Sequence, residues 1–302
     1  MSALAVPPRS RWARSMGAVL VTLAGFAWVA SKVDPSEVLA ALAQTELMWW
    51  VVAVLLVPLQ TALAAERWHQ ASHLLGLPLT RRAAWTEFAL STAINQLFPG
   101  GIAGDGLRIW RQRARQHGLV SAMRAALVDR WWGQSTLAVL VLGGLLAWPD
   151  SVPRPAGLVP GVLIAVAGVA TVWFIPSGVP ALGRLSDDLR RTLPAGTAVL
   201  LIPSCGLLAA ILAGLAACGL ALGLAPGAWL LCAAPLALLA ASIPVSLGGW
   251  GLREGSLVAL LPLFGPSTAD ALALSLLFGL AFLVGALPGL VFLRAAPSEP
   301  AA

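Results

Sequence analysis

Residues 95–108 read NQLFPGGIAGDGLR, and residues 242–255 read SIPVSLGGWGLREG. Both stretches run through a proline, a pair of glycines, a further glycine and then Leu-Arg. Because proline and glycine break helices, each stretch predicts an interrupted helix within an otherwise apolar region. The two interruptions fall in different halves of the chain and match each other, which is the sequence pattern of an inverted repeat.

The composition around these stretches is that of a membrane protein. Of the 302 residues, 59% are hydrophobic and 11% are charged, against about 25% charged residues in soluble domains. No charged residue occurs from Trp131 to Trp148 or from Thr197 to Pro244. A soluble domain of this length would need a charged surface, so we expect lipid to surround most of the chain.

Six apolar runs reach or approach the roughly 20 residues that a membrane-spanning helix needs. They are residues 15–31, 47–65, 127–148, 157–176, 197–223 and 270–293. Residues 86–98 are too short to cross, and the run 228–264 is interrupted by Pro244 and its neighbouring glycines. We therefore predict an all-α, polytopic integral membrane protein with about six spanning helices and two re-entrant helical hairpins, at 86–104 and 228–264.

The basic residues predict the orientation of the chain. Fifteen of the nineteen lysines and arginines fall in segments that lie on the cytoplasmic side if the N-terminus does. These segments are residues 9–14, 66–126, 177–196 and Arg294. The positive-inside rule therefore places the N-terminus in the cytoplasm and the protein in the cytoplasmic (plasma) membrane. We then expect the first hairpin to enter from the cytoplasm and the second from outside. The alternative is a full crossing by residues 228–247 with a short re-entrant piece at 250–265, which would place the C-terminus outside.

We expect one membrane domain over residues 1–302. Residues 1–14 form a cytoplasmic N-terminal segment, residues 15–148 the first half, residues 157–294 the second half, and residues 295–302 a disordered tail. The basic residues lie between apolar runs and not on one face of a soluble core, so we expect membrane lipids with anionic headgroups as partners and no nucleic acid. A second copy of the chain and a lipid-synthesis enzyme are further candidate partners.

Three motifs, in this order, resemble those of a known family. They are P-G-G-x-x-G-D-x-x-R at 99–108, D-R-x-x-G at 129–133, and S-x-G-G-x-G-x-R-E-G at 246–255. Together they resemble the flippase-like membrane domain of lysylphosphatidylglycerol synthases and their standalone relatives, over roughly residues 10–294. The synthases also carry a soluble aminoacyl-transferase domain. Since this chain ends at Ala302, we expect a standalone member without that domain.

The broken segments are also the expected binding site. Glycine allows the backbone to turn its N–H groups inward around an anionic oxygen, and Arg108 and Arg253 could each bind a phosphate through two hydrogen bonds. The expected substrate-binding residues are Gly100, Gly101, Gly104, Asp105, Arg108, Asp129, Arg130, Ser246, Gly248, Gly249, Gly251, Arg253 and Glu254.

Each of these motifs also has a structural interpretation. Asp105 could cap a cytoplasmic amphipathic helix whose arginines meet lipid phosphates without specificity. Arg253 and Glu254 could form an ion pair that fixes a hairpin. Asp129 and Arg130 could form a pair at the membrane boundary, with Arg130 reaching toward the headgroups. The sequence leaves these alternatives open.

The resemblance implies a flippase-like transporter of a lipid or lipid-linked anionic amphiphile between leaflets. The alternatives are a membrane enzyme or accessory subunit in phospholipid, glycolipid or hopanoid metabolism, and a structural scaffold. We identify no catalytic residue and expect no cofactor, since no G-x-x-x-x-G-K-[ST] motif occurs. His69 and His73 have a spacing that suits a metal, but with only Glu66 nearby we predict a structural role and no metal site.

Overall fold

The computed structural model describes residues 19–20, 22–77, 79–97, 103–113, 118–159, 162, 180–242 and 251–294. These residues form helices and turns and contain no strand, which confirms the all-α prediction. A helix over residues 22–30 comes first. It is followed by α2 (Pro35–Ala43), α3 (Leu47–Leu74), α4 (Arg81–Leu97), α5 (Ala103–Gln112), α6 (Leu119–Leu146), α8 (Pro180–Ala221), α9 (Ala228–Ser242), α10 (Leu252–Leu260), η1 (Leu261–Phe264), α11 (Thr268–Ala286) and η2 (Leu287–Leu293).

Three helices among the described residues are long and apolar enough to span a membrane: Leu47–Leu74, Gly196–Ala221 and Thr268–Leu293. They coincide with three of the six predicted runs and fit a multi-pass membrane protein. The first predicted run is helical over 22–30, whereas almost all of 157–176 lies outside the described residues.

α6 is as long as α3 but carries polar side chains in its middle. Asp129, Arg130 and Gln134 lie near the centre of its 28 residues, and only the part from Leu137 onward is continuously apolar. Ionisable groups at such a position in a membrane helix usually face a protein interior or a wet cavity, and they are commonly functional. The polar middle of α6 is therefore a candidate functional site.

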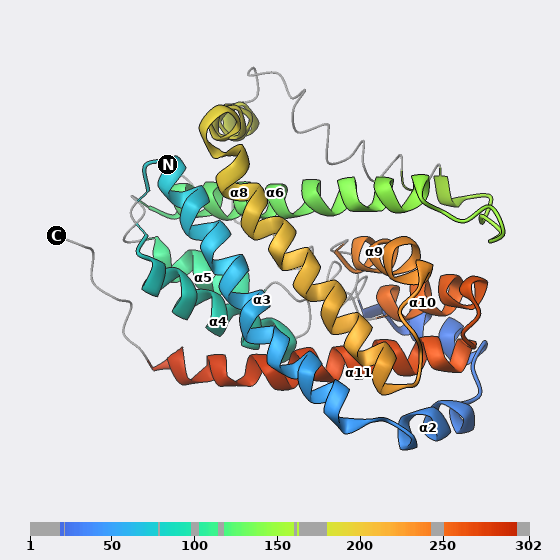
Figure 1. Ribbon diagram of the computed structural model, residues 1–302. Helices are drawn as coiled ribbons and strands as arrows, with labels where there is room; N and C mark the ends of the chain where they lie inside the picture. The colour runs from blue at the N-terminus through green and yellow to red at the C-terminus, as the bar shows by residue number, and fades with distance from the viewer. Residues whose placement is uncertain are drawn as a thin grey trace.

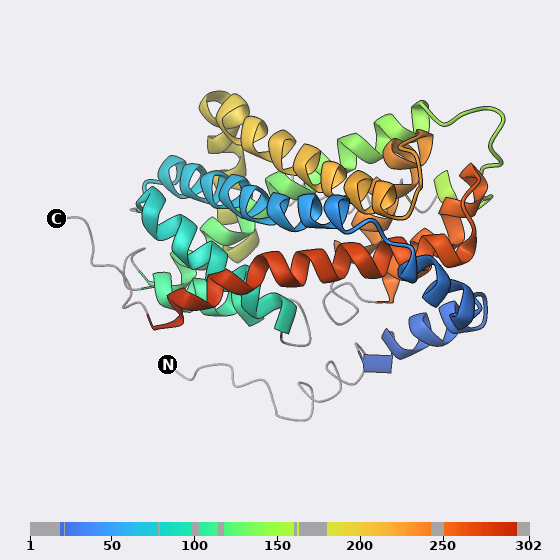
Figure 2. The same ribbon diagram turned by 60° about the horizontal axis from the view of Figure 1, so that its bottom comes forward.

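The long helices α3, α6, α8 and α11, the last continued by η2, form the main body of the molecule, which we call the frame. Figure 1 shows α3 and α8 crossing the view as a diagonal pair, with α6 on one side and α11 continuing into η2 on the other. Figure 2 shows α3 between α8 and α11. Small residues let α3 and α8 approach: a Cβ on Gly206 would contact Leu63, and one on Gly214 would contact the amide of Gln60.

The two interrupted segments form two pairs of short helices. α4 packs on α5, and α9 packs on α10. In Figure 1 the α4–α5 pair lies at one end of the frame and the α9–α10 pair at the other. The junctions of both pairs, residues 98–102 and 243–250, lie outside the described residues.

Glycines permit the close crossings that fix these pairs in the frame. A Cβ on Gly104 of α5 would overlap the carbonyl oxygen of Ser91 in α4. A Cβ on Gly144 of α6 would likewise overlap the carbonyl oxygen of Leu231 in α9. At both crossings the glycine Cα lies directly against the backbone of the neighbouring helix, which any larger residue would prevent.

Candidate functional site in the middle of helix α6

A buried ion pair joins α3 to the middle of α6. The Arg67 Nε donates to the Asp129 Oδ1 at 2.8 Å, and the two residues are 7% and 3% exposed. One turn after Asp129, the absent side chain of Gly133 leaves room for this guanidinium, since a Cβ there would lie 2.8 Å from the Arg67 Nη1. The first and last residues of the D-R-x-x-G motif thus hold one arginine between them.

Arg108 of α5 lies beside this pair and is 3% exposed. Its Nη2 is 3.3 Å from the Asp105 Oδ1, and its Nη1 is 3.6 Å from the Asp129 Oδ2. The centre of its guanidinium lies 4.3 Å from the ring centroid of Trp68 and 4.5 Å from that of Phe88. Two aromatic rings and two carboxylates therefore stabilise the cation and fix its position.

Two of the Arg108 nitrogens lack a hydrogen-bond partner. Nε and Nη1 are buried, and no acceptor among the described residues hydrogen-bonds to either. A buried donor without an acceptor costs about 1–3 kcal/mol, so such atoms are uncommon in stable interiors. An oxygen that approached this side of the guanidinium would remove that cost.

A second ion pair links α5 to α6. The Arg130 Nη2 donates to the Asp105 Oδ2 at 3.1 Å, and 54% of the Arg130 side chain is exposed. We call the connected group of charged residues the polar cluster. It consists of Arg67, Asp105, Arg108, Asp129 and Arg130. Three arginines against two aspartates give it a formal charge of +1.

The polar cluster opens into a small pocket between α5 and α6. Its volume is about 100 Å³, and its polar lining comes from Asp105, Arg108 and Arg130. Binding sites for whole small molecules are typically about 300–1,000 Å³. The pocket therefore suits one small anionic group, with any attached apolar part lying outside it.

A separate set of charged residues holds the start of α10 to α11. Glu254 is fully buried; its Oε1 accepts from the Arg253 Nη2 at 2.7 Å and from the Ser275 Oγ at 2.9 Å. Its Oε2 accepts from the Gly251 N–H at 2.6 Å. Arg253 also donates through Nε to the Ser275 Oγ at 2.9 Å. The carboxylate is fully hydrogen-bonded and the pair is neutral, so this set fixes the position of α10 against α11.

Both interrupted segments approach α6 near its centre. The Ser242 Oγ, at the end of α9, donates to the Gln134 Oε1 at 3.2 Å. Arg130, one turn earlier in α6, binds Asp105 at the start of α5. The end of α9 and the start of α5 therefore meet neighbouring turns of one helix. Among the described residues, no hydrogen bond or ion pair joins the Arg253–Glu254 pair to the polar cluster.

The structure brings four predicted site residues together in the polar cluster: Asp105, Arg108, Asp129 and Arg130. Gly104 lies next to them, where its N–H donates to the Asn95 Oδ1 at 2.7 Å and ties α5 to α4. Gly251, with a φ of +84°, precedes α10 in a conformation that favours glycine. The remaining predicted residues, Gly100, Gly101, Ser246, Gly248 and Gly249, lie outside the described residues.

The predicted site residues did not include Arg67, Trp68 and Phe88. Both Arg67 and Arg108 were counted in the cytoplasmic segment 66–126; α3 continues to Leu74, and both arginines are buried within the protein. The available signal was an arginine next to a tryptophan directly after a long apolar run. A buried cation implies a buried partner, but the sequence does not show which aspartate supplies it.

The histidine pair has structural contacts. The His69 Nδ1 lies 2.6 Å from the carbonyl oxygen of Leu79, and Glu66 binds Arg81 and Gln70. Within the described part of the chain, no three His, Cys, Asp or Glu side chains gather closely enough to hold a metal ion.

A family model described as the lysylphosphatidylglycerol synthase TM region matches residues 15–289, which is nearly the whole chain. No curated protein matches the chain.

Proposed function

The chain belongs to the lysylphosphatidylglycerol synthase TM region family, and from this premise we propose that it is a flippase-like transporter. It moves a lipid or lipid-linked amphiphile with an anionic head between the two leaflets. The observation that supports this most directly is Arg108, a buried arginine with two nitrogens that lack a hydrogen-bond partner, in a cluster of formal charge +1.

The charge of the cluster favours an anionic ligand. A charge at membrane depth is costly unless it is paired, and here one positive charge has no carboxylate of its own among the described residues. A phosphate would supply the missing negative charge and would accept from the Arg108 Nε and Nη1. The guanidinium is already oriented by Trp68 and Phe88, so binding requires little reorganisation.

Arg130 provides the approach to this site. More than half of its side chain is exposed, whereas Arg108 behind it is buried. In our proposal an anionic head meets Arg130 first and then moves to Arg108, while its apolar chains remain in the surrounding hydrocarbon. Both arginines share Asp105, so the carboxylate keeps each cation in place when the ligand is absent.

We further propose that α4 with α5, and α9 with α10, are two re-entrant hairpins of an inverted repeat. Each pair packs on itself, the pairs lie at opposite ends of the frame, and both approach the centre of α6. Binding sites of transporters with inverted repeats commonly lie where such interrupted helices meet near the membrane midplane. The first hairpin enters from the cytoplasm and the second from outside.

The orientation in this proposal follows from the basic residues. With Arg67 and Arg108 removed from the loop count, thirteen lysines and arginines still lie on the side of the N-terminus. This asymmetry supports a cytoplasmic N-terminus in the cytoplasmic membrane. Labelling of a cysteine introduced at Gly255 and another at Ala295 from the two sides of intact cells tests it. An externally labelled Ala295 would contradict the proposed path of the last helix.

A transport assay in proteoliposomes tests the function. We expect fluorescent phosphatidylglycerol to cross the bilayer faster with the protein than in protein-free vesicles. The variant Arg108→Gln keeps a polar side chain but removes the guanidinium and its charge, so we expect transport to fall at least tenfold. The partly exposed Arg130→Gln should fold normally and lose part of the activity. Arg154→Gln, an exposed external residue with a comparable charge change, is the matched control.

Two results would contradict the proposal that the polar cluster serves lipid transport. One is unchanged movement of the fluorescent lipid in folded Arg108→Gln protein, judged by an unchanged thermal unfolding midpoint. The other is chemical conversion of the headgroup without movement between leaflets, which would support a membrane enzyme. Native mass spectrometry of co-purified lipids would then identify the amphiphile that binds the polar cluster.

A further inference from the structure

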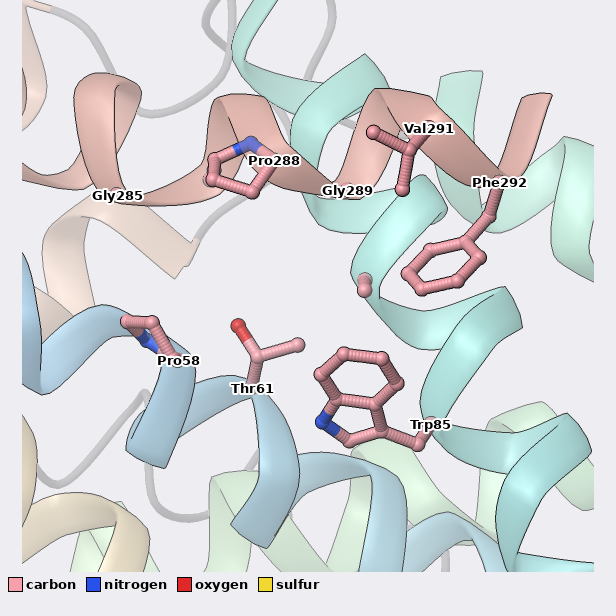
Figure 3. Close-up of a pocket in the computed structure, with 10 residues that line it drawn as sticks. Pro58, Thr61, Trp85, Gly285, Pro288, Gly289, Val291 and Phe292 are labelled. Carbon is pink, nitrogen blue, oxygen red and sulfur yellow. The ribbon is translucent and has the colours of Figure 1, made fainter.

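A second pocket lies between α3, α4 and the junction of α11 with η2, and it shares no lining residue with the polar cluster or its pocket. Its volume is about 300 Å³. Figure 3 shows Trp85 of α4 facing Pro58 and Thr61 of α3 on one side and Phe292 of η2 on the other. We call it the apolar groove.

The lining of the groove offers a ligand almost no polar atom. The only side-chain hydroxyl among its lining residues is that of Thr61, and it already donates to the carbonyl oxygen of Val57 at 2.9 Å. One end is closed by an edge-to-face contact between Trp85 and Phe292, with ring centroids 5.3 Å apart and planes at 79°. A ligand of the groove must therefore be bound by apolar contact.

Two glycines shape the floor of the groove. Gly285 lies against the backbone of α3, where a Cβ would be 2.7 Å from the carbonyl oxygen of Val54. Gly289 lies against α4, where a Cβ would overlap the carbonyl oxygen of Ala89. The helices touch at these two points and diverge between Trp85 and Pro58, which leaves the space open.

The position of the groove in the membrane favours a hydrocarbon chain. Its walls belong to two of the candidate spanning helices, Leu47–Leu74 and Thr268–Leu293, and to α4. Apolar side chains beside it face outward, with Leu287 40% and Val291 72% exposed. In a membrane these side chains contact lipid, so an acyl chain can enter the groove sideways from the bilayer.

Two exposed arginines, Arg82 and Arg294, lie within three residues of groove-lining residues in the chain, and we call them the rim of the groove. Arg82 lies on the same face of α4 as Trp85 and Ala89, at i, i+3 and i+7. It is exposed, and no described side chain pairs with it. Arg294, two residues after Phe292, is also exposed. A tryptophan between an apolar groove and two cations marks the level of the lipid headgroups.

We propose that the apolar groove binds one acyl chain of an anionic phospholipid, whose phosphate is held by Arg82 and Arg294. The charge of the rim selects anionic over zwitterionic lipid, and the groove fixes the chain next to Trp85. This lipid site is separate from the polar cluster and does not depend on the proposed transport function.

Quenching of Trp85 by lipids with brominated acyl chains tests the proposal. The Trp85 signal is the difference in fluorescence between the unmodified chain and Trp85→Phe in reconstituted vesicles. Brominated phosphatidylglycerol in a phosphatidylcholine bilayer should quench this signal at a lower mole fraction than brominated phosphatidylcholine. In Arg82→Gln, measured against Arg82→Gln with Trp85→Phe, the half-quenching fraction of phosphatidylglycerol should rise about fivefold, since one arginine near anionic lipid contributes about 1 kcal/mol.

Two matched variants complete the test. Arg190→Gln removes an exposed arginine of α8, which does not line the groove, and should leave the half-quenching fraction unchanged. Arg108→Gln should also leave it unchanged, so failure of the transport proposal is distinguishable from failure of this one. Equal quenching by the two brominated lipids overturns the proposal, as does an unchanged half-quenching fraction in the double variant Arg82→Gln with Arg294→Gln.

Discussion

The guanidinium of Arg67 occupies the space that a side chain at Gly133 would fill, with its Nη1 2.8 Å from the position of a Cβ there. Arg67 is held in this place by its 2.8 Å hydrogen bond to Asp129, one turn earlier on the same face of α6. The glycine and the aspartate of the D-R-x-x-G motif therefore act on the same cation.

Gly133→Ala should displace Arg67 from Asp129. The added methyl forces the buried guanidinium to move, and we expect the free energy of unfolding to fall by about 1–3 kcal/mol. The measurement is unfolding of the detergent-solubilised protein. Gly143→Ala on the same helix, where nothing lies within 4 Å of the added Cβ, is the control.

A double-mutant cycle shows whether the ion pair is the cause. In the background of Asp129→Asn the guanidinium is held less firmly, so Gly133→Ala should cost less by at least about 0.5 kcal/mol. Equal costs in the two backgrounds would mean that Gly133 acts through some contact other than Arg67.

Gly104→Ala should separate α5 from α4. Its Cβ would overlap the carbonyl oxygen of Ser91, which belongs to helix backbone and cannot rotate away. We expect a loss of about 1–3 kcal/mol in the free energy of unfolding, together with weaker transport, because Arg108 moves with α5. Gly106→Ala, two residues along α5 and without a neighbour within 4 Å, should be neutral or stabilising by up to about 1 kcal/mol. Similar losses of unfolding free energy in Gly104→Ala and Gly106→Ala would mean that the backbone freedom of glycine in α5 matters, and not the crossing of α5 with α4.

Gly144→Ala tests the crossing between α6 and α9. Its Cβ would overlap the carbonyl oxygen of Leu231 in α9, whereas a Cβ at the adjacent Gly143 meets nothing within 4 Å. We expect Gly144→Ala to lower the thermal unfolding midpoint and Gly143→Ala to leave it unchanged or raised. If the two adjacent alanines behave alike, α9 does not cross α6 at this glycine.

Much of the fold was predictable because membrane-spanning helices are set by local composition. The runs 47–65, 197–223 and 270–293 each coincide with a long apolar helix, since a helix in lipid must satisfy its own backbone and needs only sufficient apolar length. The ends of the helices were less predictable. α3 continues to Leu74 because Arg67 and Trp68 have partners inside the protein, and a count of apolar residues cannot register those partners.

The candidate site was predictable only in part. Asp105, Arg108, Asp129 and Arg130 were identified from short motifs, and they lie in one cluster. The same reasoning placed Arg253 and Glu254 at the binding site. The structure shows them hydrogen-bonded to each other and to Ser275, and their proposed contact with a ligand stays a prediction. A motif specifies which residue types occur but not which neighbour each one meets.

The sequence by itself determined that this chain is helical, that it belongs in lipid, and where its helices are interrupted, because length, apolar content and proline or glycine act on the backbone locally. The tertiary structure alone decided that Arg108 would lie on Trp68 and Phe88 with two nitrogens lacking a hydrogen bond, and that Arg67 would fill the space at Gly133. Those contacts join residues far apart in the chain, and packing between α3, α5 and α6 sets them. The charge balance of the site is therefore a property of the assembled helices.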